Sequence, residues 1–453
     1  MAPKLFLGAV CFSLLAVGAA GCSSSGSPAF GPNAGPAQSV TSGNRHSGSS
    51  SKIKHVVIII QENRSFVNLF SGFPGADAPK VGYEHDGTKV TLSQMSFKGL
   101  GLNHGFNTSV VDWDNGKMDG FDLSSPSSPK FPYSYLTRSD VTPYWTMAKS
   151  YVLADRMFPT QFGGSFSAHL NLIAGTDKIS PTVAITDYAS MDPWGCDAPN
   201  GTKSFIVNSS RQVSKKGPFP CFTQFKTMAD TLDAAGVSWK YYAPQTIDCS
   251  DECDGGGLEW SSFDAISNVR YGPDWQRNVI NPQTAILNDA PNGTMASVSW
   301  VVPDLKDSDH PGTNSDTGPS WVAAVVNAIG KSQYWDSTAI VVVWDDWGGW
   351  YDDAPPPQLD FLGLGIRVGC VIISPYAKAH TVSHTQYEYG SILKFIEETF
   401  GLASLGYSDA RATSISDSFD FTQAPIPFKH IKAKYPAKHF LLERPSFRPP
   451  DDE

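Results

Sequence analysis

Apolar runs rich in β-branched residues alternate along the chain with segments of helical spacing. Three runs have the length and composition of buried parallel strands, and they span 54–60, 339–344 and 367–373. Helical spacing is found at 226–236, 320–329 and 389–400, and a further strand-like segment follows at 237–242. This alternation predicts an α/β fold with a doubly wound, mostly parallel sheet flanked by helices. The Gly-, Asp- and Asn-rich stretch 245–300 is expected to be an elaborated loop region.

The pattern changes at both ends of the chain. Residues 1–22 resemble a secretory signal, with Lys4 ahead of a short apolar stretch. It ends in Ala19-Ala20-Gly21-Cys22, which is similar to a bacterial lipobox with a lipidated Cys22; plain secretion with cleavage near Gly21 is the alternative. Residues 23–51, rich in Ser, Gly and Pro, are expected to form a flexible tether. One catalytic domain is predicted at 52–425, followed by a Pro-rich C-terminal extension at 426–453. The protein is therefore expected to be exported, as a cell-envelope lipoprotein or in secreted form.

Composition narrows the function classes. With 453 residues, of which 41% are hydrophobic, the chain can bury a sizeable core. The net charge of -10 and the absence of a long basic run argue against nucleic acid or an anionic membrane surface as a partner. A membrane is expected as a partner only through the lipid anchor.

The cysteines agree with export. Cys249 and Cys253 are near enough in sequence to bridge locally, and a Cys196–Cys221 bridge would close a loop. A zinc site at Cys249 and Cys253 is the alternative, although no second Cys or His pair follows at suitable spacing. Cys370 lies inside an apolar run and is expected to be a buried free thiol.

Oxygen-bearing side chains follow two of the apolar runs. Glu62 and Asn63 come directly after the first run, and Asp345 and Asp346 directly after the second. In open α/β sheets, ligands bind outside the carboxyl ends of the strands. Two adjacent carboxylates also repel each other unless a cation or a proton intervenes. The four side chains therefore predict a shared divalent-metal site.

A Gly-rich turn introduces a candidate nucleophile. Ser165 follows Gly163-Gly164 and precedes a predicted helix at 170–174, whose N-terminus would favour a phosphate. Ser167 is an alternative nucleophile, and capping of the helix is the alternative role for either serine. His104 and His310 lie in polar loops and are candidates for binding anionic oxygens or protonating a leaving group. No Gly-x-Ser-x-Gly elbow is present around Ser165, which argues against an ordinary α/β-hydrolase triad.

Together these motifs resemble the bacterial phosphoesterase family, which includes phospholipases C and acid phosphatases and is related to the alkaline phosphatase superfamily. The similar stretches run in order over about 52–422, and they are 61–66, 116–121, 309–311, 345–352, 365–368, 373–375 and 391–397. The resemblance implies an alkaline-phosphatase-like fold. It also implies metal ligation by Glu62, Asn63, Asp345 and Asp346, a nucleophile at Ser165, and histidines near the phosphoryl group at His104 and His310.

The chain departs from the family pattern at two places. Ser167-Ala168-His169 follows the nucleophile where the family often has Pro-Asn-Arg. Tyr351-Asp352-Asp353 stands where the family often has Tyr-Asp-His, so no ligand or acid role is assigned to Asp353.

The sequence thus predicts metal-assisted hydrolysis of phosphate esters through a phosphoseryl intermediate. One divalent ion is expected, with Mg²⁺, Ca²⁺ or Mn²⁺ favoured over Zn²⁺ by the oxygen ligands. The substrate is a phosphate ester, either a phosphomonoester or a phospholipid diester. The alternative is a catalytically inactive surface-binding lipoprotein that retains the fold.

Overall fold

The computed structural model describes residues 52–191, 194–244 and 260–444. The signal, lipobox and tether predictions, and the Cys249 and Cys253 predictions, lie outside these residues. Within the described ranges, no helix has the length and apolar character needed to span a bilayer.

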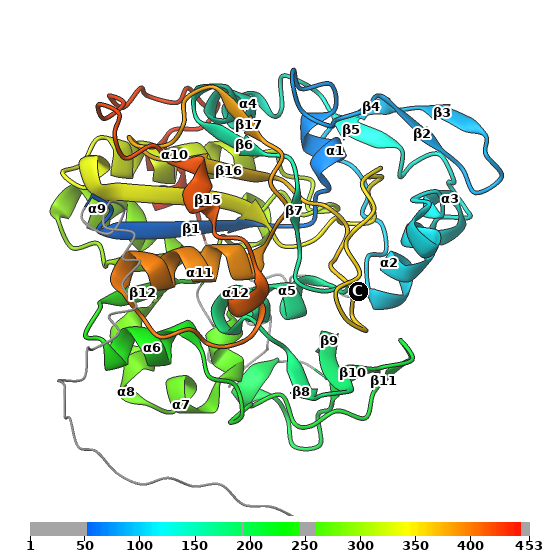
Figure 1. Ribbon diagram of the computed structural model, residues 1–453, viewed down its shortest axis with the longest axis horizontal. Helices are drawn as coiled ribbons and strands as arrows, with labels where there is room; N and C mark the ends of the chain where they lie inside the picture. The colour runs from blue at the N-terminus through cyan, green and yellow to red at the C-terminus, as the bar shows by residue number, and fades with distance from the viewer. Residues whose placement is uncertain (1–51, 192–193, 245–259, 445–453) are drawn as a thin grey trace, which may run out of the picture. The chain divides into compact units, whose positions relative to one another are not determined.

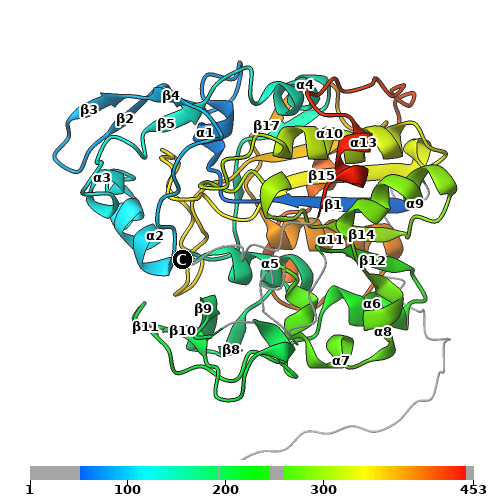
Figure 2. The ribbon, with the colours of Figure 1, turned by 180° about the vertical axis from the view of Figure 1, so that it is seen from behind.

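A central eight-stranded sheet forms the middle layer (Figures 1 and 2). Its order across the sheet is β13 (Val279–Ile280), β12 (Trp239–Tyr242), β14 (Val298–Val301), β1 (His55–Gln61), β15 (Thr338–Trp344), β16 (Cys370–Ile373), β6 (Val152–Ala154) and β17 (Thr381–Ser383). Most neighbours are parallel, and only β16 runs against both of its neighbours. The predicted α/β class and mostly parallel sheet are therefore confirmed.

Two helical layers cover the sheet. Figures 1 and 2 show α4 (Thr142–Ser150), α9 (Ile286–Asn292) and α10 (Gly318–Gly330) on one face. On the other face lie α5 (Ser165–Ala174), α6 (Met228–Ala234) and α11 (Tyr389–Phe400). Strands β1 and β15 are buried almost throughout, which explains why their sequences read as unbroken apolar runs.

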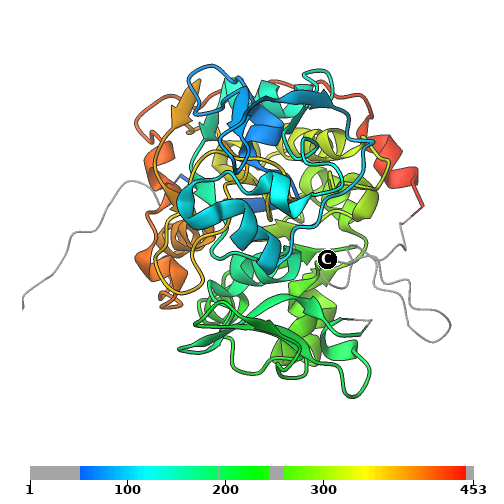
Figure 3. The ribbon, with the colours of Figure 1, turned by 90° about the vertical axis from the view of Figure 1, so that its right-hand side faces the viewer.

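Smaller elements surround these layers. A four-stranded sheet, seen at the bottom of Figure 3, contains β11 (Val213–Ser214), β10 (Ser204–Asn208), β9 (Val183–Ala189) and β8 (Lys178–Ser180). Three strand pairs are β2 (Val81–Tyr83) with β3 (Lys89–Thr91), β4 (Ser93–Met95) with β5 (Ser134–Leu136), and β7 (Met157–Phe158) with β18 (Tyr387–Glu388). The short helices are α1 (Phe66–Phe70), α2 (Phe106–Trp113), α3 (Phe121–Ser124), α7 (Ser267–Arg270), α8 (Pro273–Asn278), α12 (Ser408–Arg411) and α13 (Ala437–Leu442).

The expectation of a loop region at 245–300 is wrong for its described part. Residues 260–300 contain α7, α8 and α9 and two strands, one of which, β14, pairs with β1 in the middle of the sheet. The apolar run of β14 is only four residues long, and the helices around it carry Gly, Pro and Asn. Hydrophobic periodicity is hard to recognise in such short elements. Burial in the sheet then overrides their weak local secondary-structure propensity.

The described cysteines agree with the sequence analysis. Cys196 and Cys221 form a disulfide bond. Cys370 is a buried free thiol in β16, and burial raises its pKa well above the ordinary value.

Candidate functional site

The register of β1 and β15 places their two polar ends side by side. Gln61 at the end of β1 pairs with Trp344 at the end of β15. The backbone then turns sharply, because Asn63 adopts a positive φ of 53°. Asn63 N donates to Asp345 Oδ1 at 2.8 Å, and Asp345 N donates to Gln61 O at 2.9 Å. Glu62, Asn63, Asp345 and Asp346 are all fully buried.

Gly348 and Gly349 follow Asp345 and Asp346, and the close approach of the two strand ends requires a glycine at position 348. Gly348 has a φ of +64°, and a Cβ built on it would lie 2.1 Å from Asn63 O. Its backbone N donates to Asp346 Oδ1 at 2.8 Å, which fixes that carboxylate. A side chain at this position would therefore separate the strand ends and release Asp346.

Helix α5 carries the two candidate serines in different orientations. Ser165 is its first residue, and the Ser165 hydroxyl donates to Asp346 Oδ2 at 3.3 Å. The Ser167 hydroxyl instead donates to Gly164 O at 3.0 Å, within its own helix. The structure therefore brings Ser165, and not Ser167, to the strand ends. The helix also begins five residues earlier than the sequence predicts, so Ser165 belongs to its first turn.

The Asn63 amide lies at the centre of this group. Its Nδ2 is 2.5 Å from His104 Nε2, 3.2 Å from Ser165 Oγ and 3.2 Å from Asp346 Oδ2. His104 Nδ1 is 2.6 Å from Leu102 O and donates to it, so Nε2 is the ring nitrogen that faces Asn63.

His310 joins His104 at the same place. The two ring centroids are 6.0 Å apart, and His310 Nδ1 donates to Pro311 O at 2.6 Å. Both histidines are more than nine-tenths buried. All seven site residues named from the sequence thus fall into one buried cluster built from β1, β15, α5 and two loops.

The sequence analysis missed His169 as a member of this cluster. His169 is fully buried, and its Nε2 lies 2.8 Å from Glu62 Oε1. One ligand atom from each of Glu62, His169 and Asp345 can be chosen so that all three lie within 4.8 Å of one another. A sequence signal existed, since His169 is four residues after Ser165 and so shares its face of the helix. That signal becomes visible only when the helix is known to begin at Ser165.

These residues fit a divalent cation. Burial lowers the pKa of His169 to about 4, so its imidazole is neutral at pH 7 and suited to ligation. Asp345 Oδ2 and His169 Nδ1 make no hydrogen bond within the described residues, although both are buried. A bound cation would satisfy such atoms. The imidazole adds a nitrogen donor to the oxygen set, and imidazole donors suit Zn²⁺ and Fe²⁺, whereas the oxygen donors suit Mg²⁺, Ca²⁺ and Mn²⁺.

The departure at Tyr351-Asp352-Asp353 has a structural explanation. Arg367 is fully buried and donates from Nε to Asp352 Oδ1 at 2.9 Å and from Nη2 to Asp353 Oδ1 at 3.0 Å. The two carboxylates therefore neutralise a buried guanidinium and hold the loop after β15 against the core.

The tryptophans around Asp346 belong to the core. Trp344, Trp347 and Trp350 are each exposed by 1% or less, so none of them presents a surface to a substrate. Trp347 Nε1 donates to the buried Asp112 Oδ2 at 2.9 Å, and the Trp347 ring packs edge-on against His104. Asp112 thus holds the Trp347 ring in its position against His104.

Asp112 makes stability depend on pH. Burial raises its pKa from 3.8 to about 7. Between these values the folded protein keeps a proton that the unfolded chain has released, so the free energy of unfolding falls as pH rises through this window. Asp112→Asn should flatten that fall and should be more stable than wild type at about pH 8, with a smaller difference at about pH 5. Urea unfolding at both pH values measures the effect. The exposed Asp336 provides the control Asp336→Asn, and equal slopes for all three proteins would contradict the prediction.

Comparison with known proteins adds independent information. The sequence pattern of the "Phosphoesterase family" matches residues 53–403. "Phospholipase C B" of Mycobacterium tuberculosis is 24% identical, over 84% of this chain and 80% of that protein. "Non-hemolytic phospholipase C" of Pseudomonas aeruginosa is 24% identical, over 82% of this chain and 57% of that longer protein.

Among solved structures, a protein in the alkaline phosphatase superfamily from Vibrio parahaemolyticus aligns over 82% of this chain and 73% of that chain, at 12% identity and a TM-score of 0.38. The family match covers more than half of the chain and includes both strand ends, α5 and the two histidine loops. This chain belongs to the phosphoesterase family, and it is a hydrolase that acts on phosphate esters.

Proposed function

We propose that this protein hydrolyses phosphodiesters of the phospholipid type with the help of a divalent metal, and that Ser165 is its nucleophile. The observation that carries the proposal is the position of the Ser165 hydroxyl. It lies at the first residue of α5, 3.3 Å from Asp346 Oδ2 and within hydrogen-bonding distance of the Asn63 amide. Ser165 Oγ therefore lies next to an acceptor for its proton, Asp346 Oδ2. It also lies at the N-terminus of a helix, which favours a phosphate.

The metal ligands proposed from the sequence are Glu62, Asn63, Asp345 and Asp346, and the geometry adds His169 to them. A divalent cation held there would favour the ionised form of the serine hydroxyl and neutralise charge on the transferred phosphoryl group. His169 enters the proposal as a neutral ligand whose ring is fixed by Glu62 and by Trp260, which stacks parallel to it at 6.4 Å.

The chain's own groups account for the proton movements. Ser165 Oγ bonds to phosphorus while the bond to the leaving-group oxygen breaks, and Asp346 Oδ2 accepts the hydroxyl proton. His104 and His310 stabilise the phosphoryl oxygens or give a proton to the leaving oxygen. Water then attacks phosphorus and the Ser165–phosphorus bond breaks, so that the water hydroxyl stays on the phosphorylated product and the remaining water proton restores the Ser165 hydroxyl. Asp346 releases the proton it had accepted, and the histidine that served the leaving oxygen takes up one proton, which completes the cycle.

The substrate class rests on the relatives, which are named phospholipases C and extend over most of this chain. The catalytic residues by themselves suit a monoester equally well. The inactive-protein alternative predicts no turnover at all.

A hydrolysis panel separates these possibilities. Purified protein should cleave phosphatidylcholine and bis-p-nitrophenyl phosphate faster than p-nitrophenyl phosphate, and a chelator should abolish all three activities. A preference for p-nitrophenyl phosphate would instead indicate a phosphomonoesterase. No turnover with any substrate, after reconstitution with Mg²⁺, Ca²⁺, Mn²⁺ or Zn²⁺, would support the inactive protein.

A further inference from the structure

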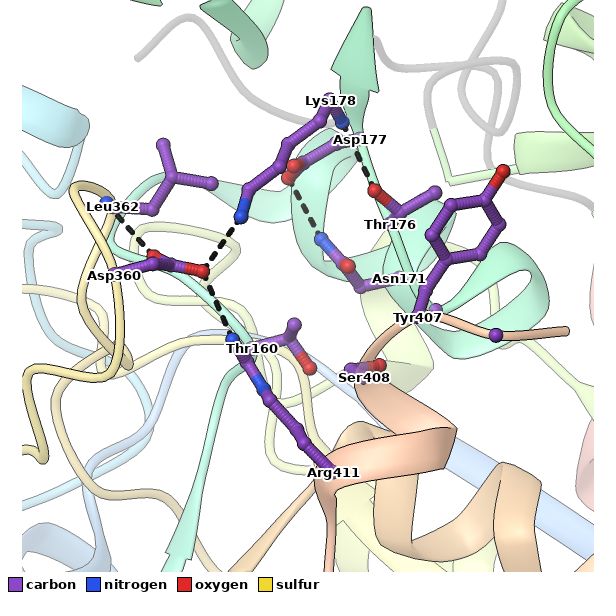
Figure 4. Close-up of a pocket in the computed structure, with 12 residues that line it drawn as sticks. Thr160, Asn171, Thr176, Asp177, Lys178, Asp360, Leu362, Tyr407, Ser408 and Arg411 are labelled. Atoms are coloured by element: carbon purple, nitrogen blue, oxygen red, sulfur yellow. Dashed lines mark hydrogen bonds and ion pairs between the residues drawn. The ribbon is translucent and has the colours of Figure 1, made fainter. Parts of the chain in front are cut away.

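A polar cavity lies at the opposite end of α5 from Ser165. It encloses about 250 Å³ between the end of α5, the start of β8 and the segment that leads into α12 (Figure 4). Asn171 is the first residue of α5 that lines the cavity, and it lies six residues after Ser165, which is about 9 Å along the helix axis at a rise of about 1.5 Å per residue. The residues of the proposed catalytic cluster do not line it.

The charges in the cavity balance one another. Lys178 Nζ and Arg411 Nη1 both lie against Asp360 Oδ2, at 2.7 and 2.9 Å. Arg411 also makes a two-pronged ion pair with Glu388, at 2.8 Å for each contact. Because each cation already contacts a carboxylate, the cavity has no net positive charge with which to attract an anion.

The cavity wall also contains two polar atoms for which the described residues supply no hydrogen-bond partner. Asn171 Nδ2 donates to Ser167 O and to Asp177 Oδ2, both at 2.8 Å, and these two acceptors fix the orientation of the amide. Asn171 Oδ1 and Ser408 Oγ make no hydrogen bond within the described residues. The two side chains are 0% and 4% exposed, so leaving these atoms unsatisfied is costly.

An aromatic ring completes the lining. Tyr407 is 43% exposed, which makes it one of the few large aromatic side chains of the described surface that remain open to solvent. Tyr407 and Ser408 both line the cavity, so its wall contains an aromatic ring and a hydroxyl group. An apolar ring beside a few fixed donors and acceptors is a common composition for small-molecule sites.

We propose that this cavity is a second binding site, which takes a neutral polyhydroxylated molecule the size of a monosaccharide. Hydroxyl groups both donate and accept, so they can satisfy the Asn171 carbonyl and the Ser408 hydroxyl and can also accept from Lys178. Its volume falls just below the range of about 300–1,000 Å³ that is usual for drug-sized ligands, which fits one sugar ring and not a longer oligosaccharide. Binding here does not depend on the proposed phosphoesterase chemistry.

Ligand-observed NMR with the full chain tests the proposal. The probes are glucose, galactose, mannose and myo-inositol, with inorganic phosphate as the anionic comparison. At least one of the four neutral probes should bind, and phosphate should not displace it. Tyr407→Ala and Ser408→Ala should each weaken that binding by about tenfold or more, because they remove the ring contact and a buried hydrogen bond.

The matched control is Tyr83→Ala, which removes an exposed tyrosine outside the cavity and should leave binding unchanged. Circular dichroism of each variant excludes misfolding as the cause of a loss. The proposal is overturned if no neutral probe binds, if phosphate competes for the site, or if the Tyr407 and Ser408 variants bind as wild type does. Hydrolysis of p-nitrophenyl phosphate is measured in parallel, so a failure of this site is distinguished from a failure of the catalytic proposal.

Discussion

Ser165→Ala is expected to abolish turnover while leaving the melting temperature almost unchanged. Removing a covalent nucleophile should cost about 4 kcal/mol or more of transition-state stabilisation, which is about a thousandfold in kcat. The fold should tolerate the change, because Ser165 contributes a hydroxyl at the first turn of α5 and no helix cap is lost with it. Steady-state kinetics and thermal unfolding of the same preparation measure the two quantities.

Ser167→Ala is the matched control, two residues away on the same helix. It removes only the hydrogen bond to Gly164 O, so it should cost about 1 kcal/mol of stability and leave kcat near the wild-type value. A loss of turnover in Ser167→Ala with an active Ser165→Ala would move the nucleophile by two residues. If both variants stay active, direct attack by water becomes the better mechanism.

The second large effect is expected on metal content. Asp345→Asn combined with Asp346→Asn removes two negative charges at the end of β15 while nearly preserving side-chain volume. His169→Gln removes the imidazole donor next to Glu62. Both proteins should lose metal, and the loss of affinity should exceed the about 10–100-fold that is typical of an outer-shell partner. Mass spectrometry of the purified proteins after dialysis against a metal series gives the content directly.

Asp86→Ala controls for the loss of an exposed carboxylate and should retain wild-type metal content. Unchanged metal in the Asp345/Asp346 double variant would mean that the ion is bound elsewhere. If only His169→Gln keeps its metal, the ligand set is the one predicted from the sequence, without the imidazole. The identity of the metal that binds in stoichiometric amount shows whether the nitrogen donor matters for selection.

Much of the site was predictable because its residues follow features with a strong local signal. The strands before Glu62 and Asp345 are seven residues long and almost wholly buried, so their apolar runs are unmistakable. The polar residues at their ends are adjacent in sequence, which makes each pair conspicuous. The Gly-rich turn and the polar loops also marked Ser165, His104 and His310 as candidates, and the family motifs then connected these distant segments with one site.

Short elements gave a weaker signal. Strand β14 is four residues long, yet it pairs with both β1 and β12 in the middle of the sheet. Its neighbours in the sheet are distant in sequence, so the contacts that stabilise it are invisible to a local pattern. The same is true of β16, whose direction is set by how the chain returns to the sheet and not by its composition.

The sequence by itself determined the α/β class, the family, and the two pairs of oxygen-bearing side chains at the strand ends, because these depend on hydrophobic periodicity and on motifs of adjacent residues. Only the tertiary structure decided which serine faces Asp346, since this depends on the residue at which α5 begins. It also decided that His169 lies against Glu62 and that Lys178 and Arg411 share Asp360. These pairs are separated by many residues along the chain, and only packing of the sheet, helices and loops brings them within hydrogen-bonding distance.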